Sequence, residues 1–244
     1  MSTSTRCIQP EALDELPADD PRAQRSRRDL QRVHRAMRTV TILRRAVSKL
    51  RLCTAPAHIL ELGAGDGSLL LRFARALQPP WTGVQLTLLD RHALISERTS
   101  DAYRELGWQV RALSAEALTW AAEPRPRRYD LCITNLFLHH FDRTDLVALL
   151  RAVAASSRAF VACEPRRSAS AHIASRLVAL LGANQITRED AVKSVAAGFN
   201  GLELSSAWRS AEADWILGEY AAAPFTHCFI AVRADAQIGA AHGP

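Results

Sequence analysis

Lysine, aromatic residues and closely spaced cysteines are all scarce in this sequence. Only two of its 31 basic residues are lysine, and 6% of its residues are aromatic. Its five cysteines stand alone at positions 7, 53, 132, 163 and 228 without a C-x-x-C pair, so neither a zinc motif nor a disulfide framework is expected. Three of them lie in apolar segments, as buried free thiols do. We therefore expect a protein of the reducing cytoplasm.

Long apolar runs are absent as well. No stretch of about 18 apolar residues occurs, so we expect no membrane-spanning helix. The first residues, Met1 to Arg6, do not have the apolar character of a secretory signal, and no export is expected. A chain of 244 residues is long enough for one α/β domain with an N-terminal extension. We expect a monomer or a homodimer.

Negative charge is in the minority, and the net charge is +6. Eleven arginines and lysines fall between Arg22 and Arg51, where a single helix is predicted. In the simplest interpretation, this helix exposes its charged side chains to water and binds no partner. A surface for RNA or for another acidic ligand is the alternative that the charge leaves open.

The order of apolar and turn-forming segments predicts four parts. Residues 1–21 form a flexible lead-in, and 22–51 an amphipathic helical cap with apolar residues at steps of three and four from Leu30 to Leu50. The main domain covers 52–233, and a disordered tail covers 234–244. Within the main domain, helices at 168–182 and 187–198 form a cover for the substrate.

Strands and helices alternate through most of the main domain, which predicts a seven-stranded, mostly parallel sheet with helices on both faces. The expected strands are 57–63, 84–90, 108–113, 129–135, 158–163, 202–209 and 226–233, and the expected helices between them include 66–78, 93–106 and 142–155.

Residues 58–67, His-Ile-Leu-Glu-Leu-Gly-Ala-Gly-Asp-Gly, are the most informative segment. A buried strand runs directly into a turn with three glycines, and a helix follows. Without Cβ atoms the turn lets a ligand approach the backbone, and the helix N-terminus offers unpaired N–H groups. Glu61 is unusual, because a carboxylate inside a buried strand is costly without a partner. A tight turn with no ligand remains the alternative.

The run from Glu61 to Gly67 resembles the first motif, E/D-x-G-x-G-x-G, of class I S-adenosylmethionine-dependent methyltransferases. It does not match the G-x-G-x-x-G of dinucleotide-binding folds. The resemblance implies a Rossmann-like sheet whose last strand is antiparallel. It also implies S-adenosyl-L-methionine as the cofactor and S-adenosyl-L-homocysteine as the product, with no metal expected.

The resemblance assigns the cofactor contacts to the edge of the sheet. Asp90, at the end of the second strand and followed by Arg91, would accept hydrogen bonds from the ribose, and its alternative role is to cap the next helix. Glu116, with the Ala115 backbone, would meet the adenine, although an acidic Asp is usual there. The full set is Glu61, Gly63, Ala64, Gly65, Gly67, Asp90, Arg91, Ala115, Glu116, Asn135 and Leu136.

The segment from Tyr129 to Asp142 resembles the fourth motif of small-molecule methyltransferases. It lacks the N/D-P-P-Y/F signature of enzymes that methylate nucleobase or glutamine nitrogens, which argues against such substrates without excluding them. His139 stands where phenolic O-methyltransferases carry a catalytic base, and His140 follows it. Either histidine suits the removal of a hydroxyl proton, and both could instead cap the next helix or pack below the cofactor.

The substrate contacts predicted from position are His34, Met37, Glu164 and Arg166. For Glu164, an ion pair with Arg166 or Arg167 is the alternative.

The predicted function is therefore methyl transfer to a small organic acceptor in secondary metabolism, with O-methylation of an aromatic or polyketide-type hydroxyl as the first hypothesis. Nucleic acid is not the expected partner. The alternatives are C- or N-methylation of a small molecule, an RNA methyltransferase that uses the arginine-rich helix, and an inactive subunit that binds cofactor.

Overall fold

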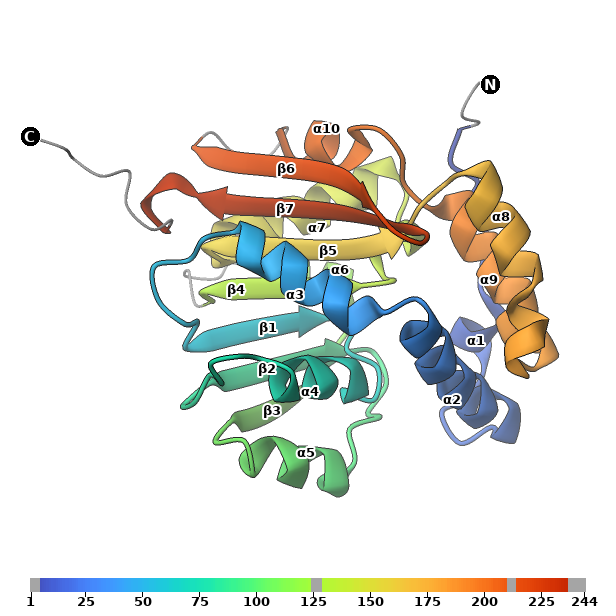
Figure 1. Cartoon of the computed structure of the whole chain (residues 1–244), viewed down its shortest axis with the longest axis horizontal. Coiled ribbons are helices and arrows are strands. Elements are labelled where there is room, and N and C mark those ends of the chain that lie inside the picture. Colours follow the sequence, from blue (N-terminus) through green and yellow to red (C-terminus); the bar gives the residue numbers. More distant parts are fainter. Residues whose placement is uncertain (1–4, 124–128, 210–213, 237–244) are drawn as a thin grey trace, which may run out of the picture.

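A seven-stranded sheet forms the centre of the molecule (Figure 1). The structure is a computed structural model and describes residues 5–123, 129–209 and 214–236. The strand order is β3-β2-β1-β4-β5-β7-β6, and β7 is antiparallel to both of its neighbours. The strands are β1 (His58–Leu62), β2 (Gln85–Asp90), β3 (Gln109–Ser114), β4 (Leu131–Asn135), β5 (Ala159–Pro165), β6 (Trp215–Ala222) and β7 (Thr226–Arg233). The predicted mostly parallel sheet with an antiparallel last strand is confirmed.

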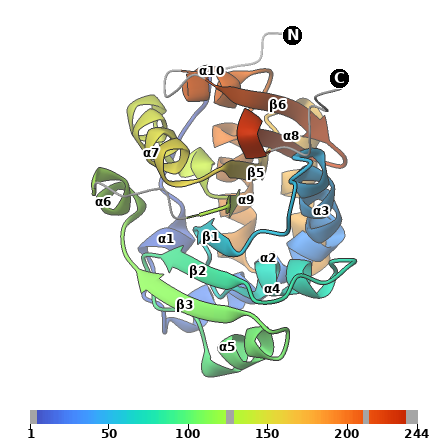
Figure 2. The same ribbon diagram turned by 90° about the vertical axis from the view of Figure 1, so that its left-hand side faces the viewer.

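Helices cover both faces of the sheet, as the alternation predicts (Figure 2). On one face, α3 (Thr39–Lys49), α4 (Ser68–Arg75) and α5 (Glu97–Arg104) pack against apolar side chains such as Ile59 and Leu88. On the other face, α6 (Ala117–Ala122), α7 (Arg143–Ser156) and α10 (Glu203–Arg209) pack against residues such as Leu60 and Phe160. Successive residues of a strand point to opposite faces, so β1 supplies both cores.

The sheet register places the carboxyl ends of three strands at one edge. Leu62 of β1 pairs with Leu89 of β2 and with Thr134 of β4. Residues just beyond these pairs, including Asp90 and Asn135, therefore lie beside the turn that follows β1. This is the edge where open α/β sheets bind ligands.

The predicted single N-terminal helix is wrong, because the structure has two. α2 (Pro21–Ala36) starts with Asp20 as its N-cap and Pro21 in its first turn. It ends before Arg38, whose φ of 56° interrupts helical geometry, and α3 then begins at Thr39. The break lets α3 bury its apolar stripe on the sheet while α2 turns away to lie beyond the carboxyl edge (Figure 1).

The flexible lead-in predicted for residues 1–21 is also not what the structure has. Residues 5–20, which we call the N-terminal strap, contain the short helix α1 (Ala12–Glu15). The buried carboxylate of Asp190 accepts hydrogen bonds from the backbone N–H groups of Ala12 and Leu13, each at 2.9 Å. The guanidinium of Arg6 donates to the carbonyl of Ala197 at 2.8 Å. These contacts hold the strap against the helical cover.

The strand predicted near 202–209 is wrong too, because this segment is α10. Leu204, Ala207 and Trp208 are buried at helical spacing, and the carboxylate of Glu219 accepts from the N–H groups of Leu204 and Ser205 at its start. The sixth strand is β6 instead. The helix α6 was not predicted.

The segment between β5 and the last strands is helical, with α8 (Ala169–Arg176), η2 (Val178–Leu181) and α9 (Gln185–Ala197), and its role as a cover for the substrate stays a prediction. It lies with α1 and α2 beyond the carboxyl edge of the sheet (Figure 1). Of the predicted tail, 234–236 form a short 3-10 helix, and 237–244 lie outside the described residues, as does the loop 124–128. No described helix is long and apolar enough to cross a membrane.

Candidate functional site

A cavity of about 330 Å³ lies at the carboxyl edge of the sheet, under the N-terminal strap and α2. The cavity is lined by the glycine-rich turn, by the segments that follow β2, β3 and β4, and by α1, α2 and α9. Its polar lining residues include Glu11, Asp14, Gln31, His34, Glu61, Asp66, Asp90, Arg91, Glu116, Asn135, His139, His140 and Ser194.

The glycine-rich turn needs its glycines for two different reasons. Gly63, Gly65 and Gly67 have φ values of 68°, 55° and 71°, in the region that L-residues with side chains rarely adopt. A Cβ at Gly63 would overlap the ring of Phe137. A Cβ at Gly65 would meet no atom within 4 Å, so the backbone is bare there. A Cβ at Gly67 would lie only 3.0 Å from the side chain of Leu88, so the turn is packed at both ends and bare in its middle.

Glu61 is the buried carboxylate that the sequence marked as unusual. Glu61 is 3% exposed, and its Oε2 atom has no hydrogen-bond partner among the described residues. Burial raises its pKa well above the usual value, and the nearby carboxylates of Asp66 and Asp90 raise it further. A buried oxygen without a donor, on the wall of a cavity, indicates a ligand that brings a donor or a positive charge.

Asp90 is fixed by the backbone around it. Its Oδ2 atom accepts from the N–H of Gly65 at 2.8 Å, and its Oδ1 atom accepts from the N–H of His92 at 2.9 Å. Each carboxylate oxygen has two acceptor positions, so both retain one for a ligand. The carboxylate is therefore oriented in advance. Glu116, the N-cap residue of α6, lines the same cavity.

Polar contacts hold the strap and α2 over the cavity. The side-chain amide of Gln31 on α2 donates to Asp66 Oδ2 at 2.7 Å, which ties the helix to the glycine-rich turn. Arg91 forms an ion pair with Asp14 of α1 at 3.4 Å. His34 lies 3.5 Å from the amide of Asn135, and burial, followed by the charge of Arg72, lowers its pKa to about 4. His34 is therefore neutral at physiological pH.

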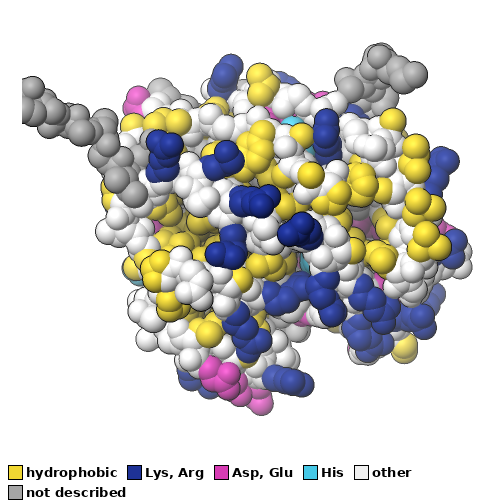
Figure 3. Space-filling model, viewed as in Figure 1, with side chains coloured by type: hydrophobic (Ala, Val, Ile, Leu, Met, Phe, Trp, Pro, Cys, Tyr) yellow, Lys and Arg dark blue, Asp and Glu magenta, His cyan; other side chains and the backbone are white. Residues whose placement is uncertain are grey.

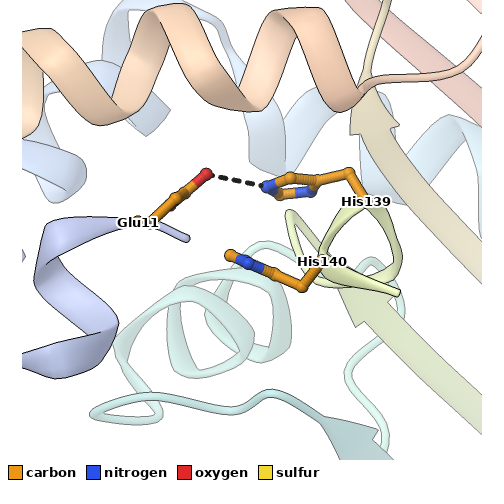
Figure 4. A group of neighbouring side chains, drawn as sticks. All are labelled: Glu11, His139 and His140. Atoms are coloured by element: carbon orange, nitrogen blue, oxygen red, sulfur yellow. Dashed lines mark hydrogen bonds and ion pairs between the residues drawn. The ribbon is translucent and has the colours of Figure 1, made fainter. Parts of the chain in front are cut away.

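His139 lies in a short 3-10 helix, η1 (Leu138–His140), and is held between two carboxylates (Figure 4). Its Nδ1 atom is 2.8 Å from Glu164 Oε2, and its Nε2 atom is 3.3 Å from Glu11 Oε1. Burial alone would lower the pKa of His139, but the hydrogen bonds to Glu11 and Glu164 outweigh it and raise the pKa to about 9.

His140 has a different environment although it follows directly. Its Nδ1 atom is 3.2 Å from Asp14 Oδ2, and its ring centroid is 4.2 Å from that of His139. Burial lowers the pKa of His140 below the usual value, and the charge of His139 lowers it further. Glu11 also accepts from the hydroxyl of Ser194 on α9. The two histidines and Glu11 thus meet at the cavity wall, with one ligand-capable atom of each within 4.8 Å of the others.

The structure brings together nearly all the predicted cofactor residues. All of them line the cavity except Gly67, which lies behind the turn at the start of α4. Of the predicted substrate residues, only His34 lines the cavity. Met37 ends α2, and the backbone N–H of Arg166 donates to the carbonyl of Phe225.

Glu164 does not reach the cavity and does not form the ion pair considered for it. It lies fully buried beneath His139 and accepts from the N–H groups of Phe137 and Leu138 at 3.0 Å and 2.9 Å. Arg167 pairs instead with Glu203 at 2.6 Å. Glu11, Asp14, Gln31 and Ser194 line the cavity but were not predicted, because they come from segments whose position depends only on tertiary contacts.

Comparison with known proteins agrees with this geometry. Residues 59–159, which contain the glycine-rich turn, Asp90 and both histidines, match the family described as "Methyltransferase domain". Among curated proteins, none matches the sequence.

Several solved structures share the fold. The plantazolicin methyltransferase BamL, in complex with a triazolic desmethylPZN analog and SAH, aligns with a TM-score of 0.62 at 11% identity, over 91% of this chain and 92% of that one. An O-methyltransferase family protein of Burkholderia thailandensis aligns with a TM-score of 0.55 at 16% identity, over 88% of this chain. A Nostoc punctiforme protein aligns with a TM-score of 0.53 at 16% identity, over 81% of this chain. This chain spans 61% and 56% of the last two proteins.

Three observations agree with the resemblance of the first motif. The sheet is mostly parallel with an antiparallel seventh strand, as that resemblance implies. The turn of the motif opens into a cavity beside Asp90, and the sequence family matches over the same segment. The chain therefore has the fold of the methyltransferases it resembles, and its residues 59–159 match the methyltransferase domain family.

Proposed function

We propose that this enzyme binds S-adenosyl-L-methionine in the cavity and methylates a hydroxyl group of a small organic acceptor. The observation that carries the proposal is the cavity itself. It joins a wall of cofactor-type residues, from Glu61 to Glu116, to a wall with two histidines and Glu11. A cofactor bound to the first wall would face the polar groups of the second.

The residues present fit the cofactor at both of its ends. The vicinal ribose hydroxyls suit the free acceptor positions of Asp90, and the adenine would lie near Ala115 and Glu116. The ammonium of the methionine portion suits the unpaired Oε2 of Glu61, because it brings both a positive charge and N–H donors. The bare backbone at Gly65 allows close approach of the ligand to the turn.

When bound, the cofactor supplies a methyl group on a sulfonium, which is already a good leaving group. The protein must therefore position the acceptor, exclude water and take the hydroxyl proton. The strap and α2 enclose the cavity, and Gln31 ties α2 to the turn. The group formed by Glu11, His139 and His140 is the place where the acceptor oxygen would lose its proton.

A small acceptor in secondary metabolism suits the enclosed site best. BamL, which has this fold over nearly the whole of both chains, was crystallised with a triazolic desmethylPZN analog and SAH. The Burkholderia thailandensis protein is described as an O-methyltransferase family protein, and by analogy with it we assign this enzyme a hydroxyl acceptor, of aromatic or polyketide type. C- and N-methylation use the same cofactor wall and also release a proton, so they are the alternative reactions of this site.

RNA is the second candidate acceptor, and one observation favours it. Arginine and lysine side chains spread across the face over α2, α3 and α4 (Figure 3). Exposed members of this face include Arg25, Arg28, Arg35, Arg44 and Arg45. This candidate predicts RNA binding that weakens steeply between about 50 and 200 mM salt. No retention of RNA on filters at the lower salt concentration would rule it out.

The cofactor assignment can be tested with two ligands and two variants. S-adenosyl-L-homocysteine and 5′-methylthioadenosine share the adenosine, but only the first has an amino group. Glu61→Gln should weaken the first ligand about 10- to 100-fold in calorimetry and leave the second nearly unchanged, since only one ammonium contact is lost. Asp90→Ala should weaken both ligands, because both carry the ribose.

Asp101→Ala, on the exposed side of α5, is the matched control and should change neither affinity. Equal effects of Glu61→Gln on both ligands would contradict the ammonium contact. Unchanged binding in Asp90→Ala would contradict the ribose contact. The acceptor itself would be found by incubating cell extracts with labelled methyl donor and the purified enzyme.

A further inference from the structure

We propose that Glu11, His139 and His140 bind a divalent transition-metal ion on the cavity wall. The ion's open coordination position would face the acceptor hydroxyl. That the open position faces an acceptor hydroxyl rests on the proposed function, whereas metal binding by the three residues does not. The proposal departs from the expectation that no metal takes part, which came from the family resemblance alone.

The ligand atoms are already close together. One ligand atom from each residue lies within 4.8 Å of the other two. Glu11 Oε1 and His139 Nε2 are 3.3 Å apart, which is about the separation of two ligands on a tetrahedral ion with bonds of about 2.0 Å. The remaining separations, which are at most 4.8 Å, must shorten for all three atoms to reach one ion. The side chains converge from two different elements, the N-terminal strap and η1 (Figure 4).

The outer contacts of the histidines have the arrangement found around metal ligands. A ligating imidazole usually donates its other N–H to a carboxylate, which fixes the tautomer and the ring. His139 has Glu164 on its Nδ1 side at 2.8 Å, which leaves Nε2 for the cavity. His140 has Asp14 beside its Nδ1 at 3.2 Å. Each histidine therefore has its own carboxylate outside the ligand set.

Glu164 is well suited to such a role because its own position is fixed. Both of its oxygens accept from backbone N–H groups of the segment that carries the histidine, including those of Phe137 and Leu138. Its side chain is fully buried. A carboxylate held in this way cannot move to solvent and keeps the imidazole of His139 oriented toward the cavity.

The composition of the group indicates the kind of ion. Two imidazoles and one carboxylate suit zinc, iron or cobalt, whereas magnesium and calcium prefer an all-oxygen set. Three protein ligands leave at least one position open. A hydroxyl bound at that position would have a lowered pKa, as metal-bound water has, so that it would give its proton to solvent water more easily. The oxygen would then form the bond to the methyl carbon while the carbon–sulfur bond breaks and its electron pair stays on sulfur. Because Glu11 belongs to the strap, the ion would also fasten the strap over the cavity.

The test is metal binding by the full-length protein without cofactor or acceptor. The protein is treated with a chelator, dialysed, and titrated with Co²⁺, followed by visible absorption and by elemental analysis after gel filtration. We expect one equivalent of bound cobalt and a visible absorption band. Glu11→Gln and His140→Ala should each weaken binding about 100-fold or more, since each removes one ligand. Zn²⁺ should displace the cobalt, and Mg²⁺ should not.

His172→Ala is the matched control, because His172 lies on α8 away from the group. It should bind cobalt like the unaltered protein. Glu219→Gln, which changes the other buried histidine–glutamate pair of the molecule, should also retain one equivalent. Circular dichroism confirms that each variant is folded.

The proposal is overturned if the unaltered protein binds less than a tenth of an equivalent, or if Glu11→Gln binds cobalt equally well. The affinity for S-adenosyl-L-homocysteine, measured on the same samples, separates this outcome from failure of the proposed function. Intact cofactor binding without metal binding would contradict only the metal proposal and would leave the proposed function standing. Metal binding without cofactor binding would leave the metal site and remove the methyltransferase assignment.

Discussion

Two buried histidine–glutamate pairs lie close together in this molecule and differ in what surrounds them. His139 and Glu164 approach to 2.8 Å, and His227 and Glu219 to 2.7 Å. In each pair the carboxylate also accepts from backbone N–H groups at the start of a short helix, η1 in the first case and α10 in the second. Glu164 and His227 are even direct partners across β5 and β7.

The two pairs differ in the other groups that surround each histidine. His139 has a second carboxylate, Glu11, on its other ring nitrogen, and both face a cavity next to His140. His227 packs against the ring of Phe199 and does not line the cavity. The pair by itself is therefore a structural device that anchors a helix to the sheet. It becomes a candidate for chemistry only where the strap adds Glu11 and the cavity gives access.

The largest effect should come from removing the cavity histidine. His140→Ala should lower the methyl-transfer rate about 10²- to 10⁴-fold. The variant removes either the base that takes the hydroxyl proton or a ligand of the ion that would help to release it. The affinity for S-adenosyl-L-homocysteine should stay within about twofold, since His140 belongs to the other wall. Steady-state kinetics and calorimetry on the same preparation measure both.

His172→Ala, an unrelated histidine on the helical cover, should leave the rate unchanged. Full activity of His140→Ala would show that His140 takes no part in the reaction, although it lies beside the pair formed by His139 and Glu164.

The corresponding change in the structural pair should affect stability instead of rate. Glu219→Gln removes a charge that accepts from Leu204, Ser205 and His227, so the free energy of unfolding should fall by about 1–3 kcal/mol. Urea denaturation measures the loss. The kcat of the folded variant should equal that of the unaltered enzyme, and a rate loss at unchanged stability would contradict the division between the two pairs.

A smaller effect should appear in the pH dependence of stability. Burial alone would raise the pKa of Glu219, but hydrogen bonds from His227, Ser205 and Leu204 outweigh it and lower the pKa below its usual 4.5. A carboxyl group with a lowered pKa in the folded state stabilises the fold above its unfolded pKa. That contribution is lost as the pH falls through the folded pKa.

The difference in stability between the unaltered enzyme and Glu219→Gln should therefore be full at pH 6 and shrink below about pH 4.5. Urea denaturation at several pH values measures it. A difference that grows as the pH falls would mean that the carboxylate is not stabilised by these donors.

Much of the cofactor wall could be predicted from the sequence because its contacts are local. Glu61 to Gly67 form one continuous strand and turn, and the alternation of strands predicts that Asp90 and Asn135 end beside that turn. A parallel sheet brings the carboxyl ends of its strands to one edge, so sequence order alone places these groups together. The prediction of α10 as a strand failed because the segment is short and its helical start depends on Glu219, which lies later in the chain.

The amino-acid sequence by itself determined the sheet, the glycine-rich turn and the position of the two histidines after β4. Only the tertiary structure decided that the strap delivers Glu11 and Asp14 to those histidines, and that Glu164 lies beneath them. The physical reason is that these contacts join residues far apart in the chain, 128 positions for Glu11 and His139 and 25 for Glu164 and His139, through side chains with no local periodicity. The break at Arg38 follows the same rule, because it lets α3 pack on the sheet while α2 lies beyond the carboxyl edge against α9.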